Sequence, residues 1–346
     1  MDVFVHVGGI KTGTSAVQSA LAANRDALKV AGLFYPPAPR ATDERAARGE
    51  ITSGNATRLA CLVRPRLRGP GFSAAQILGE LDKALAEAAG RPVLYSTEAL
   101  HALKPEQIEE LDAIFRERGA TLKVIYYVRH LLDHSAATYC QMAKVAGLSR
   151  RAQEKRSLDH FISRHVNPMH AHLASYAKVL GRERVICRLY DAERQALVPG
   201  LLDAVAPGLG LASVLSATSR DRIVNRSPTD TELALFLALN NEPDARELCF
   251  TLKNALLNAP PAVPEPLRIS QDAFDGFEAL NTGHVEAINR DFLPKETPIR
   301  LSSGGTLIGS PAGRDPARSE ASLHAAIIAL ARRAEVARRR PTDAPE

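Results

Sequence analysis

Residues 2–21 read DVFVHVGGIKTGTSAVQSAL, and this stretch decides the fold. Its first residues are mainly apolar and include three valines, as in a buried strand, while the apolar spacing from Ser15 onward is that of a helix. Between them lies GGIKTGTS, residues 8–15, which we call the phosphate loop. A glycine loop that opens a helix presents unpaired backbone N–H groups at the positive end of the helix dipole, where an anion is stabilised. The stretch therefore predicts an α/β fold with an anion site after its first strand.

The phosphate loop differs from a nucleoside-triphosphate loop in the position of its lysine. Gly8 and Gly13 keep the G-x-x-x-x-G spacing, but Thr14 stands at the usual lysine position and Lys11 comes two residues before Gly13. A triphosphate site needs lysine after the glycine to reach the outer phosphates, and a hydroxyl beside it to bind magnesium. A P-loop small-molecule kinase or NTPase is therefore an alternative that this sequence disfavours.

Further strands alternate with helices along the chain. They are predicted at VLYS (93–96), LKVIYYV (122–128) and RVICRLY (184–190), with helical patterns between them and no convincing strand after Asp191. Helices of this length between strands imply a parallel sheet with right-handed crossovers. We expect a single domain over residues 1–346, with a P-loop-type three-layer α/β fold and a central parallel sheet of about 4–5 strands flanked by helices.

Two regions break this alternation. Residues 36–71 are rich in Pro, Gly and Arg, and predict an irregular insertion with one short helix near 56–63. The insertion could form a wall of an acceptor site through its arginines, Arg40, Arg45, Arg48, Arg64, Arg66 and Arg68. Residues 242–346 predict a mainly helical C-terminal extension, with a loop or lid at 301–319 and a last helix at about 321–339.

Composition favours a soluble globular protein. Hydrophobic residues make up 45% and charged residues 24% of the 346 residues, and no signal peptide or apolar run of membrane-spanning length is evident. The four cysteines are far apart and lack metal-ligand spacing. We therefore expect a cytoplasmic protein with reduced thiols and no metal.

The formal charge of +5 admits several anionic partners. Part of it comes from ARRAEVARRR (331–340), which is usually a solvated helix face but could also touch an anionic membrane surface peripherally. Nucleic acid is disfavoured, because the chain has no Trp, only 5% aromatic residues and no recognisable nucleic-acid-binding motif. The oligomeric state is not predicted by any feature of the sequence.

The segment K-T-G-T-S after a strand, followed by a helix with Gln18 and then NRDAL (24–28), resembles the 5′-phosphosulfate loop of sulfotransferases that use 3′-phosphoadenosine 5′-phosphosulfate. It is most similar to the loop of bacterial carbohydrate sulfotransferases. The resemblance implies that the 5′-phosphate and the sulfuryl group are held by Thr12, Gly13, Thr14 and Ser15. Lys11 would contact the oxygen that bridges sulfur and phosphorus, where negative charge develops in the transition state.

A second segment, VIYYVRHLLDHSAATYCQ (124–141), resembles the strand, arginine and helix with which this family binds the 3′-phosphate. The resemblance implies that Arg129 grips that phosphate through its guanidinium fork. The serine that the family places eight residues later falls at Ala137, so Ser135 or Thr138 would supply the hydroxyl. Alternatively, Arg129 is a structural ion-pair partner of Asp133.

A third segment, LYSTEAL (94–100), resembles the family's S-S-E segment and implies that Glu98 is the catalytic base, with His101 as the alternative. His6 is expected in the core or behind the site. Two further segments resemble the family without an assigned contact: RLYD (188–191), and the N-x-S at Asn225 and Ser227.

Together these features predict a sulfotransferase that moves a sulfuryl group from 3′-phosphoadenosine 5′-phosphosulfate to an acceptor hydroxyl by in-line attack, releasing 3′-phosphoadenosine 5′-phosphate without a metal. By resemblance the acceptor is a carbohydrate or glycolipid. Besides the kinase or NTPase, a non-catalytic nucleotide-binding homologue is an alternative, because Ala137 replaces the family serine.

Overall fold

A computed structural model describes residues 1–8, 12–48, 50, 52–68, 73–145, 157–215, 226–242, 244–257, 260–261, 264–309, 323 and 327. The chain divides into two compact units, each described by itself. The first unit comprises Met1–His130, Asn167–Arg222 and Gly283–Arg300, and the second comprises Leu131–Val166, Ile223–Thr282 and Leu301–Glu346. The second unit therefore includes residues 131–166 as well as most of the expected C-terminal extension.

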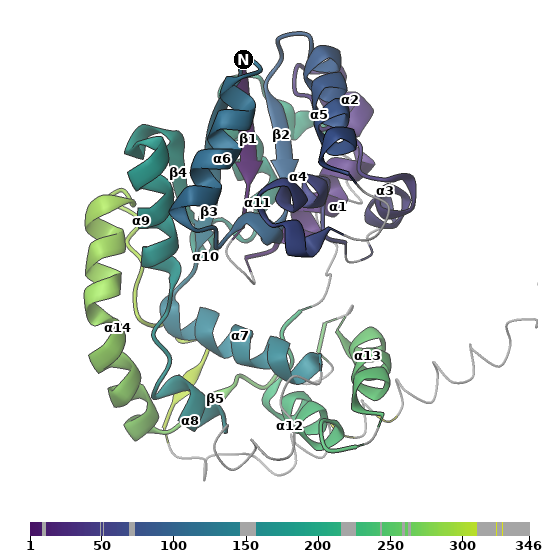
Figure 1. The fold of residues 1–346 in the computed structure, drawn as a ribbon. Helices are drawn as coiled ribbons and strands as arrows, with labels where there is room; N and C mark the ends of the chain where they lie inside the picture. The colour runs from purple at the N-terminus through teal and green to yellow at the C-terminus, as the bar shows by residue number, and fades with distance from the viewer. Residues whose placement is uncertain are drawn as a thin grey trace, which may run out of the picture. The chain divides into compact units, whose positions relative to one another are not determined.

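The first unit contains a four-stranded parallel sheet (Figure 1). Its strands are β1 (Asp2–His6), β2 (Val93–Ser96), β3 (Thr121–Val128) and β4 (Val185–Leu189), in the order β2-β1-β3-β4. All three neighbouring pairs are parallel. This confirms the α/β class and the central parallel sheet that the sequence predicts.

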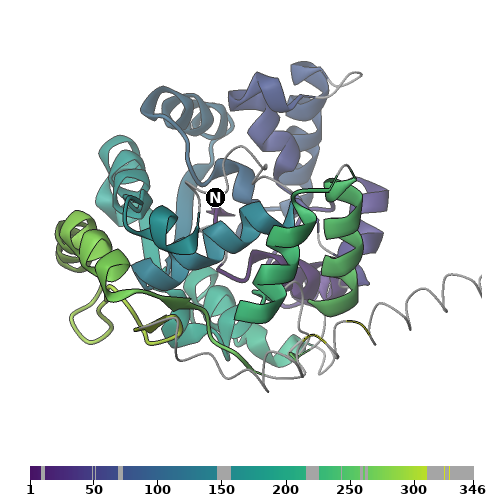
Figure 2. The same cartoon turned by 90° about the horizontal axis from the view of Figure 1, so that it is seen from below.

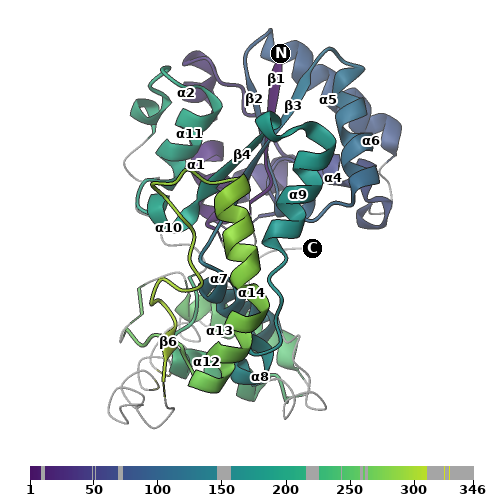
Figure 3. The same cartoon turned by 90° about the vertical axis from the view of Figure 1, so that its left-hand side faces the viewer.

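Helices cover both faces of this sheet (Figure 3). One face carries α1 (Thr14–Ala23), α2 (Arg25–Val30) and α11 (Leu197–Val205), and the other carries α6 (Pro105–Arg116) and α9 (Met169–Leu180). Because both faces are covered, the strands are nearly continuous apolar runs rather than alternating ones. On the α1 face, Phe4, Ile125 and Tyr127 pack in one core cluster with Val17 and Leu201.

The insertion at 36–71 is more regular than expected. It contains the helix predicted near 56–63, as α4 (Thr57–Val63), and also α3 (Arg40–Ala47) and the 3-10 turn η1 (Pro65–Leu67). After it, α5 (Ala74–Ala88) begins at a capping box in which Ser73 and Gln76 satisfy each other's backbone N–H groups. Shorter elements of the first unit are η2 (Glu98–Leu100), η4 (Arg182–Arg184), α10 (Tyr190–Glu193) and η5 (Leu211–Val214).

The second unit is mainly helical, with α7 (Leu131–Lys144), α8 (Leu158–Ile162), α12 (Asp230–Leu239) and α13 (Ala245–Leu256). α12 and α13, drawn in green in Figure 2, lie side by side, and α7 packs against both. The division between the units falls within α14 (Gln271–Asp291).

The expectation of no strand after Asp191 is wrong. β5 (Arg268–Ile269) and β6 (Leu307–Ile308) form a parallel pair, whose two-residue length is too short to leave an alternating pattern in the sequence. Within the expected lid, residues 301–309 are irregular apart from β6, and its remainder and the last helix lie outside the described residues except for Leu323 and Ile327. None of the helices in the described ranges has the length and apolarity needed to cross a membrane.

Candidate functional site

His6 lies at the carboxyl end of β1, between β2 and β3 in the sheet. This last residue of β1 is in register with Ser96 of β2 on one side and with Ile125 of β3 on the other. The strand order changes direction between β1 and β3, and α/β sheets bind ligands in the crevice at such a switch point. The phosphate loop follows β1 and Arg129 follows β3, so the sheet brings these two predicted parts of the site to the same edge.

Gly13 forms the N-terminal boundary of α1 in a left-handed conformation, with φ 76°. Its carbonyl oxygen accepts hydrogen bonds from the backbone N–H groups of Ala16 and Val17 at 3.0 and 3.1 Å. A Cβ on Gly13 would lie 2.4 Å from Leu197 Cδ2 and 3.1 Å from Tyr190 Cε2. Both the backbone conformation and the close packing therefore require glycine at the start of this helix.

The described part of the phosphate loop places three predicted hydroxyl residues at this helix end. Thr12 is fully buried, Ser15 is half-buried, and Thr14 is 2% exposed. Thr14 Oγ1 is buried and has no hydrogen-bond partner among the described residues, which is uncommon for a polar atom. An anion at the start of α1 would supply the missing acceptor. Lys11 lies outside the described residues, and its role stays a prediction.

Arg129 follows β3 with an incompletely paired guanidinium. Its Nε lies 3.6 Å from Asp191 Oδ1, too far for a good hydrogen bond, and is buried with no hydrogen-bond partner among the described residues. The guanidinium carbon lies 5.6 Å from the centre of the Tyr190 ring, within the range of a cation–π contact. Arg129 therefore retains donor capacity for an anion in addition to its acidic neighbour.

Tyr190 and Asp191 connect Arg129 to the phosphate loop. Asp191 accepts a hydrogen bond from the backbone N–H of His130 at 2.9 Å and so fixes the turn after β3. Tyr190 lies beside Arg129 and also against Gly13. The sequence indicated the RLYD segment by resemblance, but it could not assign these contacts.

Asp133, the alternative partner of Arg129, has other contacts in the second unit. Its carboxylate accepts hydrogen bonds from Ser303 N and Oγ at 2.9 and 2.8 Å, and from Thr306 N at 2.9 Å. The acidic neighbour of Arg129 in the first unit is instead Asp191. Asp133 therefore anchors residues 303–306 to α7.

Ser135 and Thr138 use their hydroxyl protons within α7. Ser135 Oγ donates to Leu131 O at 2.8 Å, and Thr138 Oγ1 donates to His134 O at 2.9 Å. Ala137 between them is 3% exposed. A phosphate only accepts hydrogen bonds, so either hydroxyl would have to give up its helix carbonyl to bind one. Their contact with the 3′-phosphate stays a prediction.

The two candidate bases lie just after β2. Glu98 is exposed and begins η2, and its carboxylate makes no hydrogen bond within the described residues. His101 Nδ1 lies 2.6 Å from the carbonyl oxygen of Glu98, which can only accept, so the proton is on Nδ1 and Nε2 keeps its lone pair. Burial lowers the pKa of His101, partly offset by that hydrogen bond, and its ring meets the edge of His172. His101 can therefore accept a proton on Nε2, and the Glu98 carboxylate is open to solvent.

His6 is buried at the end of β1, next to Gly8 of the phosphate loop. Its side chain is fully buried on the same face of the sheet as Phe4, and its ring meets Tyr127 edge-on with ring centroids 5.6 Å apart. Nδ1 lies 3.0 Å from Ser96 Oγ, while Nε2 is buried without a hydrogen-bond partner among the described residues. Burial lowers the pKa of His6 to about 4. The sequence indicated a core or supporting residue here, but not its partners.

Among the described residues, five of the six arginines of the insertion have partners within the first unit. Arg40 pairs with Glu44, whereas Arg45 and Arg48 both pair with Glu50, and these ion pairs are exposed. Arg64 and Arg68 donate to the backbone carbonyl oxygens of Ala99 and Cys61. In this part of the chain as the structure describes it, three of the six guanidinium groups are thus paired with two carboxylates.

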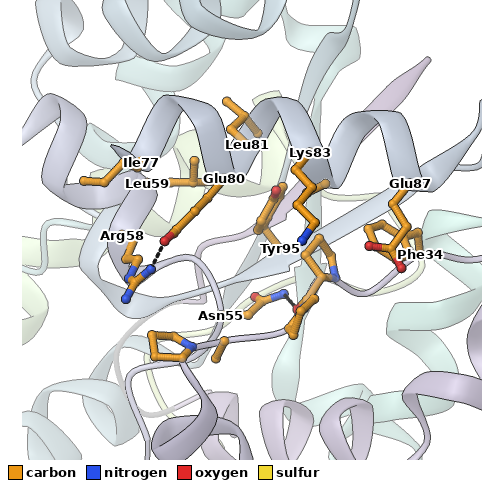
Figure 4. Close-up of a pocket in the computed structure, with 15 residues that line it drawn as sticks. Phe34, Asn55, Arg58, Leu59, Ile77, Glu80, Leu81, Lys83, Glu87 and Tyr95 are labelled. Atoms are coloured by element: carbon orange, nitrogen blue, oxygen red, sulfur yellow. Dashed lines mark hydrogen bonds and ion pairs between the residues drawn. The ribbon is translucent and has the colours of Figure 1, made fainter. Parts of the chain in front are cut away.

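The insertion also lines a pocket of about 290 Å³ between α4, α5 and residues 34–39 (Figure 4). Its walls are mainly apolar, with Phe34, Leu59 and Tyr95 among them, and Arg58 pairs with Glu80 at one side. The pocket is joined to the end of β2 through Asn55, whose Oδ1 accepts the backbone N–H of Ser96 at 2.8 Å.

Searches for related proteins give likeness at the level of structure alone. No family model matches the chain, and no curated protein matches it. Among solved structures, a sulfotransferase from Alicyclobacillus acidocaldarius is 16% identical, with 80% of this chain and 94% of that chain covered at a TM-score of 0.34. The sulfotransferase domain of the Synechococcus PCC 7002 olefin synthase is 12% identical, with 81% and 93% covered at a TM-score of 0.32. The function is accordingly inferred from the residues of this chain.

Proposed function

We propose that the protein is a sulfotransferase that binds 3′-phosphoadenosine 5′-phosphosulfate at the switch point between β1 and β3. The observation that carries this proposal is that two buried atoms at that edge, Thr14 Oγ1 on the phosphate loop and Arg129 Nε after β3, have no hydrogen-bond partner among the described residues. Both fit an anionic ligand, because a hydroxyl and a guanidinium can donate to phosphate or sulfate oxygens. The lysine position at residue 11 favours a sulfuryl donor over a nucleoside triphosphate.

In this proposal the donor supplies a sulfuryl group attached through oxygen to its 5′-phosphate. The N–H groups at the start of α1 and the hydroxyls of Thr14 and Ser15 hold the 5′-phosphate and sulfuryl oxygens, while Arg129 binds the 3′-phosphate. Lys11 neutralises the charge that develops on the bridging oxygen as its bond to sulfur breaks. Glu98, or alternatively His101, takes the proton of the acceptor hydroxyl as its oxygen bonds to sulfur.

We propose a carbohydrate or glycolipid hydroxyl as the acceptor, on the basis of the resemblance of residues 8–15 and 94–100 to bacterial carbohydrate sulfotransferases. The pocket beside α5 supports a role for the insertion as an acceptor wall, because its apolar walls and flanking ion pair would suit an amphipathic molecule. Acceptor identity can be determined by incubating the protein with labelled donor and fractionated extract, and identifying the sulfated product.

The donor proposal is tested by calorimetric titration with 3′-phosphoadenosine 5′-phosphate and with ATP, and by release of the bisphosphate from the sulfate donor. The bisphosphate should bind at least roughly tenfold more tightly than ATP, since each charge-assisted hydrogen bond is worth about 1.5–3 kcal/mol. Lys11→Ala should nearly abolish turnover. Preference for ATP would contradict the proposal, and binding without turnover would identify a non-catalytic homologue.

A further inference from the structure

Two buried polar atoms flank the same side of Gly8, at the end of β1. A Cβ placed on Gly8 would lie 2.4 Å from Thr14 Oγ1 and 3.4 Å from His6 Nε2. Both atoms are buried, and neither has a hydrogen-bond partner among the described residues. Leaving a buried polar group without a hydrogen bond is unfavourable, so two such groups beside one glycine at a helix N-terminus indicate a binding function.

His6 stands at the end of a chain of hydrogen bonds that begins at the insertion. Thr52 Oγ1 accepts the backbone N–H of Gly54 and donates to Gln18 Oε1, each at 3.4 Å. The other end of the Gln18 amide, Nε2, lies 3.4 Å from Ser96 Oγ. An amide nitrogen can only donate, so Ser96 Oγ is the acceptor in this contact.

The direction of these bonds sets the tautomer of His6. Ser96 Oγ accepts a hydrogen bond from Gln18, and its own hydroxyl can then donate one to His6 Nδ1, 3.0 Å away. With Nδ1 as acceptor, the single proton of a neutral imidazole lies on Nε2, the atom that faces Gly8 and Thr14. The opposite tautomer would leave the buried Ser96 hydroxyl proton without an acceptor among the described residues.

We propose that His6 is a positioning residue that, when an anion binds, donates a hydrogen bond from its Nε2–H to Thr14 Oγ1 and thereby directs the Thr14 hydroxyl to donate its own hydrogen bond to an oxygen of that anion. The relay from Thr52 through Gln18, Ser96 and His6 makes Thr14 an obligate donor, which suits phosphate and sulfate because their oxygens only accept. Hydrogen bonds aligned in one direction polarise one another, so the relay strengthens the final contact. The nature of the anion, a 5′-phosphosulfate, rests on the proposed function.

The tautomer can be measured without any ligand, by NMR of the imidazole nitrogens in the full-length protein. At pH 7 His6 should carry its proton on Nε2, and in Ser96→Ala the tautomer preference should weaken. A proton on Nδ1 in the wild type would overturn the proposal, because His6 could then not donate to Thr14.

The coupling between His6 and Thr14 is tested by measuring the affinity for 3′-phosphoadenosine 5′-phosphate of three variants: His6→Phe, Thr14→Val and the double variant. Each single change should weaken binding roughly tenfold, and the double variant should bind no more weakly than the weaker single variant, because the two residues act on one hydrogen bond. His6→Gln retains an N–H at a similar reach and should restore binding to within about threefold of wild type. Additive losses, or no rescue by His6→Gln, would overturn the coupling.

A matched control separates this role from general stability. Within the described part of the chain, His165 also has a buried Nε2 without a hydrogen-bond partner, but it belongs to the second unit and stacks on Phe161. His165→Phe should leave bisphosphate affinity unchanged, and thermal melts of all variants would show whether losses follow unfolding. If the wild type binds inorganic pyrophosphate but not the bisphosphate, the proposed donor is wrong, while the same variants measured with pyrophosphate still test the relay. Binding of neither anion would overturn both proposals.

Discussion

Arg129 lies over the ring of Tyr190, with the guanidinium carbon 5.6 Å from the ring centre. The same ring approaches the start of α1, where a Cβ on Gly13 would lie 3.1 Å from Tyr190 Cε2. One aromatic side chain therefore contacts both the phosphate loop and the arginine that we assign to the second phosphate. This arrangement explains how the phosphate loop after β1 and Arg129 after β3 can keep a fixed distance from each other.

Replacing Tyr190 should weaken donor binding through this spacing. Tyr190→Ala should reduce affinity for 3′-phosphoadenosine 5′-phosphate roughly tenfold, through loss of the cation–π contact and of packing against Gly13. Tyr190→Phe keeps the ring and should bind nearly as the wild type does. Calorimetric titration measures both variants, and equal affinity of Tyr190→Ala and wild type would show that the ring does not position Arg129.

Arg129→Lys should weaken bisphosphate binding by roughly 30-fold, because an ammonium cannot replace the planar donor fork on a phosphate. Arg182 offers a matched control, since it also lies over an aromatic ring, Phe292, and donates to backbone carbonyl oxygens. Arg182→Lys should lower the melting temperature without changing affinity. A normal affinity in Arg129→Lys would remove Arg129 from the proposed site.

Gly13→Ala should both destabilise the protein and abolish donor binding. An L-residue in the left-handed region costs about 1–2 kcal/mol, and here the added Cβ would also meet Leu197 Cδ2 at 2.4 Å. Gly90 isolates the backbone cost, because its φ is +83° and no atom of the residues that the structure describes lies within 4 Å of an added Cβ. In urea unfolding, Gly90→Ala should therefore lower the free energy of unfolding only by this backbone cost. Its affinity for the donor should stay that of the wild type. Equal stabilities of the two variants would contradict the packing argument.

Stability should fall on the acid side of neutrality because of buried histidines. The pKa of His6 is lowered from 6.5 to about 4 by burial, so below pH 6.5 the unfolded chain binds a proton that the folded chain does not. The stabilisation is fully present above pH 6.5 and is lost as the pH falls towards 4, by roughly 2 kcal/mol for His6 at about pH 5. His172, whose pKa is also lowered to about 4, adds to this slope. The free energy of unfolding in urea, measured at neutral pH and at about pH 5, should change less in His6→Gln than in wild type. An identical change in both proteins would show that His6 does not contribute to the pH dependence.

The kinetics of two variants can show whether Glu98 or His101 is the catalytic base. Glu98→Gln should lower kcat by at least about 100-fold with little change in donor affinity, as expected for loss of a general base. His101→Phe is the comparison: if it loses kcat while Glu98→Gln does not, His101 is the base. In that case the acid limb of the kcat profile should lie below the ordinary histidine range, because burial lowers the pKa of His101.

The fold could be predicted largely from local patterns. The strands at 2–6 and 121–128 are apolar runs bounded by loops, and they appear within a residue or two of their expected limits. Arg129 could be placed because it directly follows such a strand. By contrast, β5 and β6 are too short to show a period, and the 40–47 helix lies in a polar stretch without a strong apolar face.

Contacts between distant residues were beyond local patterns. The hydrogen bond between His6 and Ser96 joins residues 90 positions apart, and it depends on the register of β1 against β2, which no spacing along the chain reveals. The stacking of Arg129 on Tyr190 likewise requires β3 and β4 to be neighbours. A resemblance marked both regions, but only the three-dimensional arrangement shows their partners.

The buried carboxylate of Asp133 also has a consequence for biosynthesis. Its hydrogen-bond donors, Ser303 and Thr306, follow it by 170 and 173 residues, so α7 leaves the ribosome long before its partners are made. Until then this acidic group must remain hydrated or be held by other contacts, because burial without its donors is unfavourable. The second unit can thus complete its folding only after residue 306 has been translated, and truncation before residue 303 should leave the Asp133 carboxylate without these donors and destabilise the unit.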